Sequence, residues 1–127
     1  MATQWLKVNL FVCCLLGCSS GSVPETASPA IDRFFASAAA GDSAAVAQMA
    51  TNPDPVRRIL AVSTQDPEVL AALRSNRQVR SVVVNGDSAF IAFRIQTPTR
   101  TETVTIGLVR SPAGTWTVYY FGIPSRG

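Results

Sequence analysis

The chain has 127 residues, of which 47% are hydrophobic and 15% are charged, and this predicts one globular domain of ordinary size. The sequence contains no histidine, which excludes the commonest general base and metal ligand. Ten arginines and eight acidic residues follow Cys18, so the net charge of that part is only slightly positive and does not indicate a nucleic-acid partner.

The N-terminus has the pattern of an export signal, with one lysine followed by an apolar run over residues 8–16. This run is about half as long as the roughly 20 residues of a bilayer-spanning helix, so residues 1–17 predict a signal and not a span. It ends in Leu15-Leu16-Gly17-Cys18, which resembles the lipobox of bacterial lipoproteins. The resemblance implies cleavage between Gly17 and Cys18, a diacylglycerol on the sulfur of Cys18, and a membrane anchor made of lipid.

The alternative to lipidation is a secretory signal that is cut elsewhere and leaves no lipid. With Ser19 after the cysteine, the resemblance implies the outer membrane, facing the periplasm, in a host with two membranes. All three cysteines lie within residues 13–18, so we expect no disulfide in the exported domain. Residues 18–27 are mostly small and polar and predict a flexible tether to one domain over residues 28–127.

Four helices are predicted in the first half of this domain. The first begins at Ser28-Pro29, where serine suits the cap and proline the first turn, and Gly41 suits its left-handed end. Three more helices are predicted to start at Asp42, Asp54-Pro55 and Asp66-Pro67. The apolar residues of the first helix recur at helical spacing: Ile31, Phe34, Phe35 and Ala38.

The apolar period changes from helical to two after residue 77, and this predicts strands near 78–84, 88–97, 101–110 and 115–121. A two-residue turn at Asn85-Gly86 pairs Val82 with Ala89. A three-residue loop over 112–114 sets Leu108 opposite Val118 and Ile106 opposite Tyr120. In these registers one sheet face is apolar: Val82, Ile91, Phe93, Ile95, Val104, Ile106, Leu108, Trp116, Val118 and Tyr120.

The predicted fold class is therefore α+β, with N-terminal helices packed on one face of a four-stranded antiparallel meander sheet. The chain has a Phe34-Phe35 pair, a Gly41-Asp42 corner and an ending that runs from Gly114-Thr115-Trp116 to Tyr119-Tyr120. Together these resemble the NTF2-like, cystatin-related superfamily, in particular its small lipoproteins. The resemblance covers about residues 28–121. These are packing motifs, so the resemblance implies a fold and not a chemistry.

We expect no enzymatic activity, no cofactor and no metal site. The family's enzymes place acid–base residues between helix and sheet, and this chain matches none of those signatures. Its aspartates are explained as helix caps or turn residues, and the remaining candidate acid, Glu102, is expected to be a solvated strand end. No nucleophile elbow, phosphate loop or metal-ligand cluster is visible.

The second sheet face mixes threonines with aromatic residues and one arginine. Threonine-rich strands are often simply a solvated surface, because β-branched residues suit a pleated sheet. Aromatic residues beside arginine are, however, enriched at protein interfaces, and NTF2-like sheets commonly bind partners or dimerise on this side. The candidate partner-binding residues are Phe90, Arg94, Thr103, Thr105, Tyr119 and Phe121.

A second candidate site is a series of arginines near the junction of helices and sheet, which would bind anions such as lipid phosphates or cell-wall carboxylates. The alternative is a solvated face. The series consists of Arg57, Arg58, Arg74, Arg77 and Arg80.

The sequence thus favours a lipid-anchored envelope lipoprotein with a non-catalytic protein-binding or assembly module. The partner is expected to be an envelope protein or a second copy of the chain. The alternatives are a binder of a small apolar or lipid-like ligand in the cone between helices and sheet and, more distantly, an NTF2-like enzyme.

Overall fold

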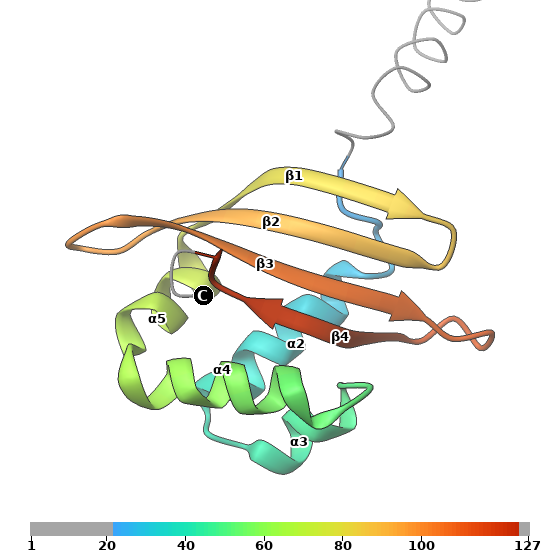
Figure 1. The fold of residues 1–127 in the computed structure, drawn as a ribbon, viewed down its shortest axis with the longest axis horizontal. Coiled ribbons are helices and arrows are strands. Elements are labelled where there is room, and N and C mark those ends of the chain that lie inside the picture. Colours follow the sequence, from blue (N-terminus) through green and yellow to red (C-terminus); the bar gives the residue numbers. More distant parts are fainter. Residues whose placement is uncertain (1–21, 125–127) are drawn as a thin grey trace, which may run out of the picture.

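The computed structural model describes residues 22–124, so the signal segment and Cys18 lie outside the described residues. In the described part of the chain, four helices precede four strands (Figure 1). The helices are α2 (Ser28–Ala39), α3 (Ser43–Gln48), α4 (Pro53–Gln65) and α5 (Pro67–Ser75). The strands are β1 (Arg77–Asn85), β2 (Ser88–Gln96), β3 (Thr101–Arg110) and β4 (Trp116–Gly122).

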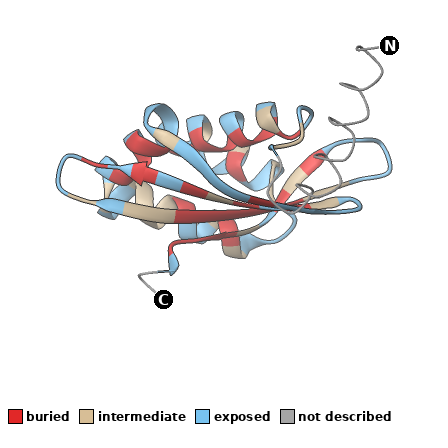
Figure 2. Cartoon of the chain, turned by 90° about the horizontal axis from the view of Figure 1, so that it is seen from above, coloured by how far each residue is buried: buried red, intermediate tan, exposed pale blue. Residues whose placement is uncertain are grey.

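The strands form one antiparallel sheet in the order β1-β2-β3-β4, which confirms the predicted α+β class and the meander. The helices lie along one side of this sheet, and buried residues gather between them and the strands (Figure 2). Phe35 of α2 contacts Phe93 of β2 and Phe121 of β4, with ring centroids 6.2 and 6.5 Å apart. None of the described helices lies on the other sheet face, which we call the open face.

The helix boundaries follow from caps and prolines, although three caps differ from expectation, at the starts of α2, α4 and α5. Helix α2 is preceded by Ala27 without a side-chain cap, and Gly41 ends it at φ +71°. Asp42 caps α3 as expected by accepting a hydrogen bond from the Ala45 amide at 3.1 Å. Helix α4 begins at Pro53, earlier than expected, because Asn52 accepts the hydrogen bond of the Asp54 amide at 2.9 Å.

The β1–β2 hairpin has the expected faces but a different register. Its turn residues are Gly86 and Asp87, so Val82 pairs with Ile91 and not with Ala89. Gly86 has a φ of +62° and Asp87 does not have a positive φ, which is the pattern of a type II′ turn. Because the pairing shifts by two residues, Val82 stays on the buried face.

An extra residue in β4 overturns part of the predicted register. Leu108 pairs with Val118 as expected, but Ile106 pairs with Phe121 because the register shifts between Leu108 and Gly107. Beyond this β-bulge the two faces of β4 exchange. Phe121 is therefore buried at 1% exposure, whereas Tyr120, predicted for the core, lies on the open face beside Phe90.

Part of the expected tether packs on the domain. Ala27 is fully buried, Val23 packs against the core, and the Thr26 hydroxyl accepts a hydrogen bond from the Trp116 indole at 2.8 Å. The packed part of the chain therefore includes residues 23–27, which the sequence assigns to the tether.

Segment 49–51 covers part of the outer edge of β4. The Thr51 amide donates to the Val118 carbonyl at 2.9 Å, and the Val118 amide donates to the Met49 carbonyl at 2.8 Å. These bonds pair edge groups that would otherwise be open to another chain. None of the helices in the described part of the chain is long and apolar enough to cross a membrane.

Candidate functional site

The open face has an aromatic surface over β2, β3 and β4, made of Phe90, Tyr119 and Tyr120. Phe90 and Tyr120 come from strands on either side of β3, and their ring centroids lie 5.5 Å apart with the planes tilted by 34°. Phe90 is 40% exposed and Tyr119 38% exposed. Exposed aromatic side chains gathered at one place on a sheet are typical of a protein-binding surface.

Two glycines make room for the tyrosine rings. A Cβ on Gly107 would lie 2.7 Å from Cζ of Tyr119, and a Cβ on Gly122 would overlap the hydroxyl of Tyr120. Both rings therefore lie over backbone that carries no side chain. The bulge places Tyr119 and Tyr120 on the same side of the sheet, the open face. The two glycines let the tyrosine rings pack directly against the backbone.

The structure separates the six candidate partner-binding residues. Phe90, Arg94 and Tyr119 are exposed, and Thr103 is half-buried. Thr105 is 7% exposed and offers little surface. Phe121 belongs to the core, where its ring centroid lies 6.4 Å from that of Phe34, so its assignment to the partner-binding face is wrong. Tyr120 is the aromatic residue of this face that the sequence pattern missed.

A groove lies beside the aromatic surface, on the part of the sheet formed by β1, β2 and β3. It has a volume of about 670 Å³ and is lined mainly by polar side chains from three strands. Gln78 pairs with Arg94 and Arg94 with Thr103, so these side chains form one row across the sheet. Arg80 is the extra residue of a bulge in β1, and its Nη1 donates to the Thr103 hydroxyl at 3.2 Å.

The structure does not bring the five arginines of the predicted series together. Arg57 and Arg58 both pair with Asp54 on their own helix, at 2.5 and 3.0 Å. Arg77 pairs with Asp32, and its guanidinium lies 5.4 Å from the ring centroids of both Phe35 and Phe93. The Arg77 guanidinium therefore packs on the aromatic rings at the edge of the core.

The other two arginines of that series lie apart from each other. Arg74 lines a separate hollow that it shares with Asp32 and Arg77. Arg80 lies in the groove beside Arg94, a residue of the other candidate set.

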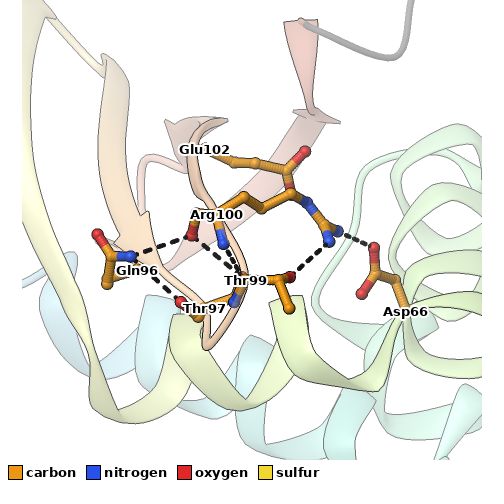
Figure 3. Close-up of polar contacts among 6 residues, drawn as sticks. All are labelled: Asp66, Gln96, Thr97, Thr99, Arg100 and Glu102. Atoms are coloured by element: carbon orange, nitrogen blue, oxygen red, sulfur yellow. Dashed lines mark hydrogen bonds and ion pairs between the residues drawn. The ribbon is translucent and has the colours of Figure 1, made fainter.

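Glu102 is not the solvated strand end that the sequence predicts. Its side chain is only 9% exposed and pairs with Arg100, whose Nε lies 3.3 Å from a carboxylate oxygen. Arg100 also pairs with Asp66 at the start of α5 (Figure 3). The carboxylate of Asp66 therefore binds this guanidinium and does not cap its helix. Glu102 thus belongs to an ion-pair cluster that connects the β2–β3 loop to the helices.

The β2–β3 loop is held by hydrogen bonds to one buried residue. The Thr97 hydroxyl accepts from the Arg100 amide at 3.0 Å, and the Thr97 amide donates to the Arg100 carbonyl at 2.8 Å (Figure 3). Thr97 is 3% exposed. These bonds set the loop conformation from which Arg100 reaches Asp66 and Glu102.

Aromatic rings fill the space between α2 and the sheet. The ring centroids of Phe34 and Phe35 lie 6.1 Å apart, and both rings contact the ring of Phe121 from β4.

Within residues 22–124 no group of three or more acidic or cysteine side chains is placed to hold a metal ion. No family model matches the chain, and no curated protein matches it.

Proposed function

We propose that this protein is a lipid-anchored envelope lipoprotein whose domain is a non-catalytic protein-binding or assembly module. The aromatic surface of Phe90, Tyr119 and Tyr120 on the open face carries the proposal. Aromatic residues and arginine are enriched at protein interfaces and among the residues that dominate binding energy, and Arg94 lies on the same strand and face as Phe90.

We further propose that the domain is of the NTF2-like, cystatin-related type. Four helices followed by a meander support this assignment, as does the ring cluster that Phe34 and Phe35 form with Phe121. The same cluster argues against a small-ligand site in the cone, because side chains already occupy the space there.

The state of Glu102 supports binding rather than catalysis. A general acid or base needs a proton-transfer group that faces a substrate, whereas Glu102 is engaged by Arg100. The partner is proposed to be another envelope protein and not a second copy. Two copies that met with their grooves face to face would oppose Arg80 and Arg94, which pair with no described carboxylate, with the same two arginines.

Substitutions on the open face test the binding proposal. Phe90→Ser is expected to weaken association with the partner about tenfold or more, because an interface aromatic residue is worth about 2 kcal/mol. Val84→Ser is the matched control, since Val84 is 44% exposed and pairs with buried Ala89, on the other face of the sheet. Association is measured by co-purification from crosslinked membranes. Equal recovery with wild type and Phe90→Ser would reject the proposal.

Membrane fractionation tests the anchor. Cys18→Ser is expected to move the protein from the membrane fraction to the soluble fraction, and mass spectrometry of the wild type to find a diacylglycerol on Cys18. A variant that stays in the membrane fraction, or an unmodified Cys18 in cells, contradicts lipid anchoring.

A further inference from the structure

The groove beside the aromatic surface has two cationic side chains and one carboxylate among its described lining residues. Arg80 and Arg94 bring two guanidinium groups, and Gln78 and Thr103 add an amide and a hydroxyl. The Thr101 hydroxyl already donates to Oε1 of Gln96 at 2.6 Å. Neighbouring strands are about 4.8 Å apart, so donors from β1, β2 and β3 reach a single small group.

The charges in this groove are not balanced by the described part of the chain. The ion pairs there involve other arginines, and neither Arg80 nor Arg94 pairs with a described carboxylate. The carboxylate that lines the groove, Glu102, is paired with Arg100. The complement of this groove is therefore an oxyanion.

We propose that Arg80 and Arg94 bind a side-chain carboxylate of the partner protein, an inference that rests on the proposed docking role of the open face. The planar fork of a guanidinium matches a carboxylate with two parallel hydrogen bonds. Phe90 lies four residues from Arg94 on the same strand and face, which corresponds to about 13 Å. One extended segment with an acidic residue and an apolar residue four positions apart contacts both.

A membrane surface fits this groove less well. Attachment to anionic lipid takes clusters of about four to eight basic residues, each contributing roughly 1 kcal/mol, and this groove has two. A nucleic-acid backbone requires a similar run of positive charge. A second copy that meets this groove with its own groove is disfavoured, because it presents the same two arginines and its carboxylate there, Glu102, is paired with Arg100. On another protein, a carboxylate would bind the two arginines of the groove, and an apolar residue near it would contact the aromatic surface.

Two peptides test the proposal with the full-length protein in detergent micelles. One extended peptide carries Glu and, four residues further on, Leu; the other carries Gln in place of Glu. The Glu peptide is expected to bind about tenfold more tightly, with affinity falling as salt is added, because a charged hydrogen bond is worth about 1.5–3 kcal/mol. Arg94→Gln and Arg80→Gln are each expected to remove most of this difference.

Arg33→Gln is the matched control, because Arg33 is exposed on α2 and pairs with no described carboxylate. It is expected to leave binding unchanged, and all three variants are expected to keep the thermal unfolding midpoint of the wild type. A shifted midpoint in Arg94→Gln or Arg80→Gln would show that the arginine serves the fold, which overturns the proposal.

Three other results also overturn the carboxylate assignment. They are equal affinity for the two peptides, no binding of either peptide, and tighter arginine-dependent binding of inorganic phosphate or phosphatidylglycerol vesicles than of the Glu peptide. Each leaves the docking role intact if Phe90→Ser still weakens association in membranes. Loss of the Phe90 effect instead removes the proposed function itself.

Discussion

Tyr119 and Tyr120 lie on the same side of β4 because the strand has one more residue there than β3 opposite it. The extra residue places Phe121 in the core, where its ring meets those of Phe34 and Phe35. A strict alternation of faces assigns Phe121 to the surface and Tyr120 to the core. Gly107 and Gly122 leave the space that the tyrosine rings need, but Gly107 lies under Tyr119 only once β3 and β4 have paired.

Truncation of the last-strand aromatics distinguishes the two arrangements. Phe121→Ala is expected to lower the free energy of unfolding by about 3–5 kcal/mol, because it removes a fully buried ring. Tyr119→Ala is expected to lower it by about 1 kcal/mol or less, because that ring is largely at the surface. Urea denaturation measures both. The opposite order would show that alternation continues through β4 without a bulge.

Gly107 allows a prediction about the aromatic surface alone. Gly107→Ala places a methyl group against the Tyr119 ring, which is free to swing outward because it is exposed. The free energy of unfolding is therefore expected to change by less than about 1 kcal/mol, while partner association falls as far as in Tyr119→Ala.

The double variant is the control for this prediction. Gly107→Ala combined with Tyr119→Ala is expected to bind no more weakly than Tyr119→Ala alone, because both changes act through one ring. Additive losses would contradict this. Equilibrium unfolding and membrane co-purification provide the two measurements.

At the scale of elements, the β2–β3 loop is tied to the start of α5 through Arg100. Its guanidinium compensates Asp66 and Glu102, whose side chains are 15% and 9% exposed. Removal of Arg100 takes an ion-pair partner from two carboxylates that are largely buried, and such a loss costs more than the loss of an exposed pair.

Arg100→Gln is therefore expected to lower the free energy of unfolding by about 1–3 kcal/mol. Arg57→Gln, which breaks an exposed pair within α4, is the control and is expected to cost less than about 1 kcal/mol. Thermal and urea unfolding of the two variants give the comparison. A smaller loss in Arg100→Gln than in Arg57→Gln would show that the cluster does not hold the loop to the helices.

The elements that the sequence predicts well are those with local signals. Gly41, Asp42 and the prolines mark helix ends, and the alternation in β2 and β3 marks strands, so their bounds agree closely with the structure. The hairpin register at Gly86 depends on which turn type the backbone adopts, and the bulges at Arg80 and Tyr119 depend on neighbouring strands. A single strand's own pattern does not contain that information.

On the scale of the whole molecule, the candidate sites depend on which strands become neighbours. Arg80 and Arg94 belong to separate sets along the chain, and the sheet places them in one groove with Thr103. Two arginines of the predicted series, Arg57 and Arg58, pair with a carboxylate on the adjacent turn of their own helix. Arg77 pairs with Asp32 at the edge of the core. Periodicity predicts which residues share a face, whereas the partners of long charged side chains follow only from the assembled fold.

The two faces of the sheet thus differ in what they contact. One face meets the helices and contains the aromatic core, and the open face has the aromatic surface beside a donor-rich groove. In the proposed function the lipid on Cys18 keeps the domain at the membrane, and the open face meets the partner.

Photocrosslinking of the full-length protein in its native membranes tests this arrangement most directly. A photoreactive phenylalanine analogue is placed at position 90 on the open face or, as a control, at position 48 on exposed α3. We expect one discrete adduct with a different envelope protein from position 90 alone, and its loss when Tyr120→Ser is added. Equal adducts from both positions, or an adduct made only of two copies of this chain, would contradict the account.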